Sequence, residues 1–424
     1  MTQVKAERSR EAHAARNFPR RIAMNLRVSR TLICLSILAG LAPAAHAADL
    51  TLEWDLRLRH EQVDDAAFAR DADANTLRVR SGLRAGFGHG WQGLVEGEGI
   101  VANRHYNSGA NGRTAYPQVI DPRGAELNQA WLKWSGHGFN TTFGRQRLLI
   151  DNQRFIGNSG WRQNEQTFDA IDLQYAPSQQ WALQYAWLGK VHRVNGDEAL
   201  DPLARERRLD THLIHAQYKG AKQQLTAYAY LHEDRDVAAA SSATHGLRWT
   251  GALPVAGAKF GWTAEAARQR DHGNNPLHFE HDYWLLEPGL QMGRWQAKAG
   301  WEHLGGDGRH ALQTPLATLH AFNGWADKFT TTPARGLDDR YLALGAAAAG
   351  ERHGGKPMLQ MAWHDYRPDA GSARYGTELD ASLSWPGAKG TTLMAKVADY
   401  RADGLGSDAR KWWLQMEWKG SAKP

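Results

Sequence analysis

The sequence predicts an all-β protein, a transmembrane antiparallel up-and-down β-barrel of about 18 strands. Three observations predict it. Short segments along the chain alternate apolar and polar residues with a period of two, as strands do when one face meets lipid and the other meets water. Short and long connections alternate between these segments, which is typical of short periplasmic turns and long extracellular loops. The chain also has 18 tryptophans, a residue that suits both edges of a membrane.

The first 47 residues predict a secretory signal peptide. Basic residues precede a short apolar run from Thr31 to Ala44, and Ala45-His46-Ala47 supplies the small residues of a cleavage site. The apolar run is too short to cross a membrane as a helix. Met24 could be the true start, because the residues before it add nothing that a signal peptide needs. We therefore expect residues 48–424 to form a single outer-membrane β-barrel domain.

Cysteine usage and charge narrow the class of the mature chain. The single cysteine, Cys34, lies in the predicted signal peptide, so we expect no disulfide and no cysteine metal site after cleavage. Residues 1–47 also hold eight of the 51 Lys and Arg and two of the 45 Asp and Glu, which leaves 43 of each. The mature chain is therefore near neutral, and the net charge of +6 is no argument for a nucleic-acid partner.

The first three strands already show the two faces of the predicted wall. From Leu50 to Arg59, leucines and Trp54 face outward while acids and arginines face inward. A second strand, Leu77 to Phe87, repeats this pattern with arginines inside. The third strand places Glu96 and Glu98 on its inner face.

Later segments keep the same period. In each of them, apolar and aromatic residues alternate with polar ones, and the aromatic residues gather at the ends, as they do at a membrane interface. The clearest of these predicted strands are Phe168 to Tyr175, Trp181 to Trp187, Trp295 to Glu302, Thr377 to Trp385 and Trp412 to Trp418.

A barrel of about 18 strands has a lumen too wide for side chains to fill, so we expect a water-filled channel unless loops plug it. Rings of charged side chains set selectivity in such channels. Inward arginines on adjacent strands would guide an anionic solute, because guanidinium groups match carboxylates. The candidates are Arg57, Arg59, Arg78, Arg80, Arg84, Arg145 and Arg147, with Glu96, Glu98 and Asp172 as the lumen acids beside them. The alternative is that these arginines and acids neutralise one another and only line a wet wall.

Two loops are longer than barrel closure requires. Residues 148–166 carry Arg154, Trp161 and Arg162, and residues 305–337 carry Trp325 and Lys328. Long ordered loops are often functional, so either loop could fold inward as a constriction, with the Trp325 ring offering a stacking surface for a sugar. The alternative is an external loop that touches only its neighbours.

The sequence supports no catalytic, metal or cofactor site. His278-Phe-Glu-His281 lacks the helical context of a zinc protease. His281-Asp282 and His364-Asp365 would face opposite sides of a strand, so neither makes a hydrolytic dyad. The acids from Asp64 to Asp73 lack the spacing of an EF-hand, and whether calcium binds them stays open.

Two segments resemble the alginate export family of Gram-negative outer-membrane barrels. They are GRQRLLIDNQRFIGNSGWRQNEQTFDAIDLQY, from Gly144 to Tyr175, and PLATLHAFNGWADKF, from Pro315 to Phe329. The strand and loop rhythm extends the resemblance over residues 50–418. The resemblance implies an 18-stranded porin whose electropositive lumen passes an anionic uronate polymer. It also implies a selective path formed by Arg57, Arg78, Arg80, Arg145, Arg147, Arg154 and Arg162.

We therefore predict a porin-like, anion-preferring channel in the outer membrane of a Gram-negative bacterium, with no cofactor. Its solute would be a uronate polysaccharide or a small carboxylate. Its other partners would be outer-membrane lipid, lipopolysaccharide and the barrel assembly machinery. An outer-membrane hydrolase and a plugged structural or adhesive barrel are the two alternatives.

Overall fold

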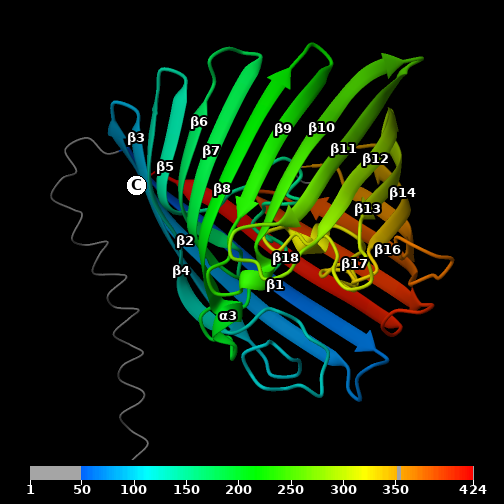
Figure 1. Cartoon of the computed structure of the whole chain (residues 1–424). Helices are drawn as coiled ribbons and strands as arrows, with labels where there is room; N and C mark the ends of the chain where they lie inside the picture. Colours follow the sequence, from blue (N-terminus) through cyan, green and yellow to red (C-terminus); the bar gives the residue numbers. More distant parts are fainter. Residues whose placement is uncertain (1–48, 351–354, 424) are drawn as a thin grey trace, which may run out of the picture. The chain divides into compact units, whose positions relative to one another are not determined.

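A closed antiparallel barrel of 18 strands makes up the part of the chain that the computed structural model describes, residues 49–350 and 355–423 (Figure 1). Each strand pairs with its neighbours in sequence, and β1 (Asp49–Asp65) also pairs with β18 (Ala409–Ala422). The ladder therefore has no free edge, and the predicted up-and-down fold is confirmed. The predicted signal peptide, residues 1–47, lies outside the described residues.

The other strands follow in chain order. They are β2 (Ala72–Gly88), β3 (Trp91–Ala102), β4 (Gly124–Gly136), β5 (Phe139–Gln146), β6 (Thr167–Tyr175), β7 (Trp181–His192), β8 (Glu206–Lys219), β9 (Gln223–His232), β10 (Ser242–Val255), β11 (Ala258–Asp271), β12 (Glu280–Met292), β13 (Trp295–Leu304), β14 (Leu337–Ala347), β15 (Met358–Arg367), β16 (Gly376–Pro386) and β17 (Thr391–Ala402). The helical turns α3 (Pro202–Arg205), η2 (Ala238–Ala240) and η3 (Leu319–Ala321) lie in connections. None of the helices in the described ranges is long and apolar enough to span a membrane.

The wall is apolar outside and polar inside, as the period of two predicts. Large apolar side chains remain exposed on the outer face, for example Leu342 at 58% and Leu344 at 63%. Charged side chains are buried on the inner face, for example Arg78 at 0% and Glu378 at 1%. This is the reverse of a water-soluble protein, and it fits a wall whose outer face meets lipid.

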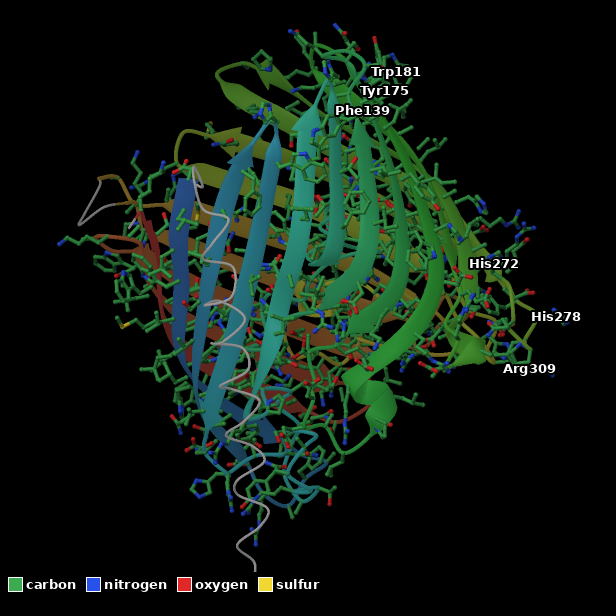
Figure 2. The ribbon with its side chains drawn as sticks, turned by 90° about the vertical axis from the view of Figure 1, so that its left-hand side faces the viewer. Phe139, Tyr175, Trp181, His272, His278 and Arg309 are labelled. Carbon is green, nitrogen blue, oxygen red and sulfur yellow. The ribbon has the colours of Figure 1, made fainter. Side chains whose placement is uncertain are left out.

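The two ends of the barrel differ in the length of their connections. Short turns such as His89–Gly90 and Ala256–Gly257 join strands at one end. Residues 103–123, 147–166 and 305–336 connect strands at the other end. Figure 2 shows Phe139, Tyr175 and Trp181 at the short-turn end and His272, His278 and Arg309 at the long-loop end. The predicted asymmetry between turns and loops is confirmed.

One short turn requires glycine. Gly90 has a φ of 84°, a left-handed conformation that glycine adopts without strain. A Cβ at this position would collide with the carbonyl oxygen of Ser135, whose backbone N–H donates to Gly90 at 2.9 Å. The turn from β2 to β3 therefore packs directly against the end of β4.

The face assignment predicts the cost of adding a charge. Leu342→Arg, on the lipid face at the middle of β14, should destabilise the barrel by about 2–4 kcal/mol, because a cation near the bilayer midplane is poorly solvated. The matched control is Ala343→Arg, the next residue, which lines an internal cavity and should cost much less. Urea unfolding in lipid vesicles measures both variants. Equal costs would contradict the assignment of the two faces.

Candidate functional site

Two of the long loops fold into the barrel and bind each other. We call residues 147–166 the first inner loop and residues 305–336 the second inner loop. The backbone N–H of Gly157 donates to Leu316 at 2.9 Å, and that of Thr318 donates to Gln153 at 3.0 Å. Gln166 adds a side-chain bond to the Leu316 carbonyl at 2.8 Å. The two loops therefore form one packed unit, and both inward placements that the sequence left open are realised.

Inward arginines on β1 and β2 hold the backbone of the first inner loop. Arg57 Nη1 donates to the carbonyls of Gly160, Trp161 and Arg162 at 3.0, 3.1 and 3.2 Å. Arg59 also donates to the Trp161 carbonyl. Arg80 Nη2 donates to the Gln163 carbonyl at 3.0 Å. These three guanidinium groups therefore bind a row of uncharged loop oxygens.

We call the five inward arginines of β1 and β2 the arginine ladder: Arg57, Arg59, Arg78, Arg80 and Arg84. They also face carboxylates, so their charges are balanced. Each of the five ladder arginines has an acidic partner on a neighbouring strand or loop. The pairs are Arg57–Glu417 at 2.7 Å, Arg59–Asp121 at 3.3 Å, Arg78–Asp55 at 2.6 Å, Arg84–Glu53 at 2.8 Å, and Arg80–Glu98. Arg84 differs from the buried four, because 35% of its side chain is exposed to the lumen.

Glu165 fixes the end of the first inner loop nearest β6. It forms ion pairs with Arg147 and Arg80 and accepts hydrogen bonds from Asn128 at 2.6 Å and Asn158 at 2.7 Å. Burial by itself would raise the pKa of Glu165, but the charges of Arg80 and Arg147 lower it to about 2. The carboxylate is therefore ionised wherever the loop is docked near neutral pH.

The first inner loop crosses the lumen to the opposite strands. Arg154 Nε lies 2.8 Å from Glu302 on β13. Phe155 packs among Tyr228, Tyr230 and Tyr283, with ring centroids 5.6, 6.0 and 5.3 Å away. This loop thus binds β1 and β2 through its carbonyls and β9, β12 and β13 through Arg154 and Phe155.

The second inner loop docks through its backbone donors, whereas the first docks through its backbone acceptors. Its backbone N–H groups at Trp325 and Ala326 donate to Asp380 at 3.2 Å and Glu378 at 2.6 Å, both on β16. Phe329 packs against three tyrosines, Tyr366 at 4.3 Å, Tyr375 at 6.0 Å and Tyr400 at 5.9 Å between ring centroids. Carboxylates therefore hold the donors of this loop, whereas arginines hold the acceptors of the first.

Lys396 on β17 joins both loops to the wall. Its Nζ lies 4.0 Å from the ring centroid of Trp161, 3.8 Å from that of Trp325 and 5.3 Å from that of Trp413. It is also 2.7 Å from Nε2 of His320. Cation–π attraction of this kind strengthens when the cation is shielded from water. Lys396 is 8% exposed, so the three indoles replace most of its hydration.

Asp327 completes this centre from within the second inner loop. It lies 2.7 Å from His320 Nδ1, 2.8 Å from Arg162 and 2.9 Å from Lys411. Burial would raise the pKa of Asp327, but His320, Lys411 and Arg162 together lower it well below its usual range. Burial also lowers the pKa of His320 well below its usual range. His320 is therefore a neutral imidazole that lies between Lys396 and the ionised carboxylate of Asp327.

Most residues predicted for the solute path or as lumen acids lie at this constriction, and three do not: Lys328, Asp172 and Arg145. Lys328 instead pairs with Asp65 at 2.8 Å. Asp172 faces inward, but it accepts from Gln174 and Gln184 at 2.8 and 2.7 Å and lies away from the arginine ladder.

The prediction that Arg145 faces the lumen is wrong. It shares the outer face of β5 with Phe143, which is 41% exposed, because side chains two positions apart lie on one face. There it pairs with Asp169 at 2.9 Å. Arg147, two positions further on, lies beyond the strand end, where the alternation stops and the side chain turns inward.

Four residues at this constriction were not predicted from the sequence: Lys396, His320, Asp121 and Glu165. The signal for Lys396 was available, because it alternates with Val397, which is 38% exposed on the outer face of β17. The other three lie in loops, which carry no period. Within residues 49–350 and 355–423, no three His, Cys, Asp or Glu side chains lie where they could hold a metal ion.

A closed 18-stranded barrel with a lipid-facing wall, a charged lumen and inward loops defines an outer-membrane, porin-like channel. The family model described as "Alginate export" matches residues 48–317, and the chain belongs to that family. Membership of this family, together with the closed barrel, makes the chain a Gram-negative outer-membrane channel rather than the hydrolase that the sequence left open.

Solved structures share this fold at low sequence identity. OpdL of Pseudomonas aeruginosa is 16% identical with a TM-score of 0.66, and the match covers 88% of this chain and 99% of OpdL. OccK9 (OpdG) of the same species is 15% identical with a TM-score of 0.68, covering 88% and 99%. OccAB4 of Acinetobacter baumannii is 12% identical with a TM-score of 0.68, covering 90% and 100%. No curated protein matches this chain in sequence.

The ionised Glu165 predicts how docking of the first inner loop depends on pH. Its pKa is about 2 when docked and about 4.3 when free. Its contribution is therefore complete above about pH 4.3 and is lost progressively as the pH falls towards 2. Single-channel current noise should stay constant from pH 7 to about 4.5 and rise below that.

Glu165→Gln should raise the noise already at pH 7 and flatten this dependence. Glu198→Gln, an exposed glutamate in the connection from β7 to β8, is the matched control and should behave as wild type. A wild-type channel that loosens at pH 6 would contradict the assignment.

The Lys396 centre predicts a loosened constriction when the cation is removed. Lys396→Met keeps the length of the side chain but removes its attraction to the indoles and to His320, which should weaken docking by about 1–3 kcal/mol. Proteinase K should then cut the inner loops at least about tenfold faster, and open-channel noise should rise.

Lys259→Met is the matched control, because Lys259 also faces inward and has no carboxylate within ion-pair distance in the described structure. Equal cleavage rates in the two variants would exclude Lys396 as the anchor.

Proposed function

We propose that this outer-membrane channel prefers anions and passes small carboxylates, including monomeric or short uronates. The observation that carries the proposal is the row of loop carbonyls, residues 160–163, held by Arg57, Arg59 and Arg80. A loop carbonyl is an uncharged acceptor, so a solute carboxylate would add ion–ion attraction and a bidentate fit at the same guanidinium donors. A solute carboxylate can therefore displace the loop from the ladder and move along it.

Two arginines offer the first contact for such a solute. Arg84 is 35% exposed and Arg147 is 29% exposed, whereas the side chains of Arg59 and Arg78 are fully buried. An incoming carboxylate would meet the exposed guanidinium groups before it competes for the buried ones. In this proposal Arg57, Arg59, Arg78, Arg80, Arg84 and Arg147 are the solute path, with Arg154 and Arg162 holding the loops that narrow it.

The size of the solute follows from the inner loops. They cross the lumen and pack two phenylalanines among six tyrosines, so they narrow the bore. This favours small solutes over the polymer that the family description suggests. One similar structure, OpdK of Pseudomonas aeruginosa, was determined with vanillate, an aromatic carboxylate of this size class.

We also propose that the barrel contacts lipopolysaccharide and is inserted into the membrane by the barrel assembly machinery.

Reversal potentials in planar bilayers test the anion preference. With a potassium chloride gradient, wild type should show a chloride-selective potential, and galacturonate should reduce the chloride current as it occupies the ladder. Arg57→Gln and Arg84→Gln should each lower the chloride-to-potassium permeability ratio at least about twofold. Arg340→Gln, an arginine on the outer face that pairs with Asp338, is the matched control. Potassium selectivity in wild type would overturn the anion preference.

A plugged structural barrel is the second candidate, and the packing inside the lumen favours it. Leu148, Ile156, Leu312 and Leu316 of the two inner loops belong to one buried apolar cluster with the wall tyrosines. Such a core resists opening, because its side chains would be exposed to water. Folded protein that gives no current at any voltage, in bilayers where a known porin conducts, would favour this candidate.

A further inference from the structure

An internal cavity of about 630 Å³ lies between the second inner loop and the short-turn end of the barrel. Strands β10 to β16 form its wall, and residues 321–325 of the loop cover it. Its volume is within the range of about 300–1,000 Å³ that small-molecule sites occupy. Its lining contains both charged groups and amides. Which of these groups already have a partner decides which kind of solute the cavity can bind.

Most charged groups that line this cavity are already paired, and the exception, Lys259, lies at its short-turn edge, next to the turn from β10 to β11. Lys298 lies 2.7 Å from Glu287, which also accepts a hydrogen bond from the Tyr341 hydroxyl. Asp339 lies 2.9 Å from His364, and Glu302 lies 2.8 Å from Arg154. A charged solute would have to break one of these pairs to bind, which costs free energy in a partly shielded site. An uncharged solute would leave them intact.

Three glutamine amides remain for a solute. Gln291 and Gln296 are register partners on β12 and β13, and Gln296 and Gln360 both pair in register with Gly345 on β14. Their side chains form no hydrogen bond within the described part of the chain. Each amide carries two donors and an acceptor with two lone pairs. Together they form a row of uncharged groups that can both donate and accept.

Gly345 makes room for this row. A Cβ at that position would overlap the Gln296 amide, so the glycine lets the Gln296 side chain lie across β14 towards Gln360. Without it, Gln296 would have to point elsewhere and the row would be broken.

Aromatic rings supply the other half of the site. Trp325 from the loop and Tyr341 from β14 line the same cavity as the three glutamines. Rings offer flat apolar faces, and a site that combines them with a few polar groups fixes the orientation of its ligand. The C–H faces of a sugar ring match the aromatic faces, and its hydroxyls match amides that both donate and accept.

We propose that this cavity binds an uncharged, hydroxyl-rich solute of the size of a mono- or disaccharide. Gln291, Gln296 and Gln360 bind its hydroxyls, and Trp325 and Tyr341 pack against its C–H faces. The site rests on the channel function but not on anion preference, because the arginine ladder on β1 and β2 takes no part in it. The channel then has a neutral binding site beside a charged one.

Single-channel recording with maltose as the probe tests this site. Maltose added at the short-turn side should cause brief current blocks whose frequency saturates with concentration. Triethylene glycol, which has few hydroxyls and no ring faces, should not cause them. The double variant Gln296→Ala/Gln360→Ala should weaken the block at least about tenfold, since two hydrogen bonds are lost. The control is Gln92→Ala, which changes an inward-facing glutamine on β3 outside this cavity. Maltose should block this variant as it blocks wild type.

Each outcome separates this site from the anion preference. Absence of a maltose block in a conducting wild type, or an equal block by triethylene glycol, would overturn the neutral site without any variant. An unchanged block in the double variant would do the same. The reversal potential of the double variant should equal that of wild type. A wild-type channel that is blocked by maltose but shows no chloride selectivity would leave this site standing and overturn only the anion preference.

Discussion

The closed backbone ladder is the constraint on which the rest of this structure depends. Lipid offers no hydrogen-bond partner, so each backbone N–H and C=O that faces it must be satisfied within the sheet. Pairing of β1 with β18, from Leu52 opposite Ala422 to Asp65 opposite Ala409, satisfies the last two edges. Closure with 18 strands then encloses a space that the wall side chains cannot fill. The loops and charges inside the barrel occupy that space.

The inner loops fill the space through two complementary kinds of contact. Arginines of β1 and β2 bind the carbonyls of the first inner loop, and carboxylates of β16 bind the N–H groups of the second. Each loop also inserts one phenylalanine among three tyrosines. The wall charges therefore satisfy the loop backbone as well as face the solute. We expect a mutation of one of these charges to change the shape of the constriction.

The near neutrality of residues 48–424 agrees with this arrangement. Most lumen arginines have carboxylate partners, so the positive and negative charges inside the barrel are largely balanced. In the proposed function, a solute carboxylate replaces an uncharged loop carbonyl on the arginine ladder. The glutamine row under the second inner loop offers unoccupied amides instead. One lumen can thus present two chemically different surfaces.

The sequence by itself determined the wall of this protein. A period of two assigns Leu342 to lipid and Arg78 to the lumen, because neighbouring side chains of a strand point to opposite faces. The alternation of short and long connections fixed which end carries the loops. These are local properties of the chain, so they can be read without knowing the closed barrel. The outward position of Arg145 followed from the same period, starting at Phe143, and was missed because the residue lies next to a loop.

Only the tertiary structure decided what fills the lumen. Lys396 and Trp413 are register partners on the neighbouring strands β17 and β18. Trp161 and Trp325 come from two loops far from them in sequence, and the four residues meet because both loops fold into the lumen. No periodic pattern marks which long loop turns inward, or which carboxylate a given arginine will meet. Those choices depend on shape and charge across the lumen, and these exist only once the first strand has paired with the last.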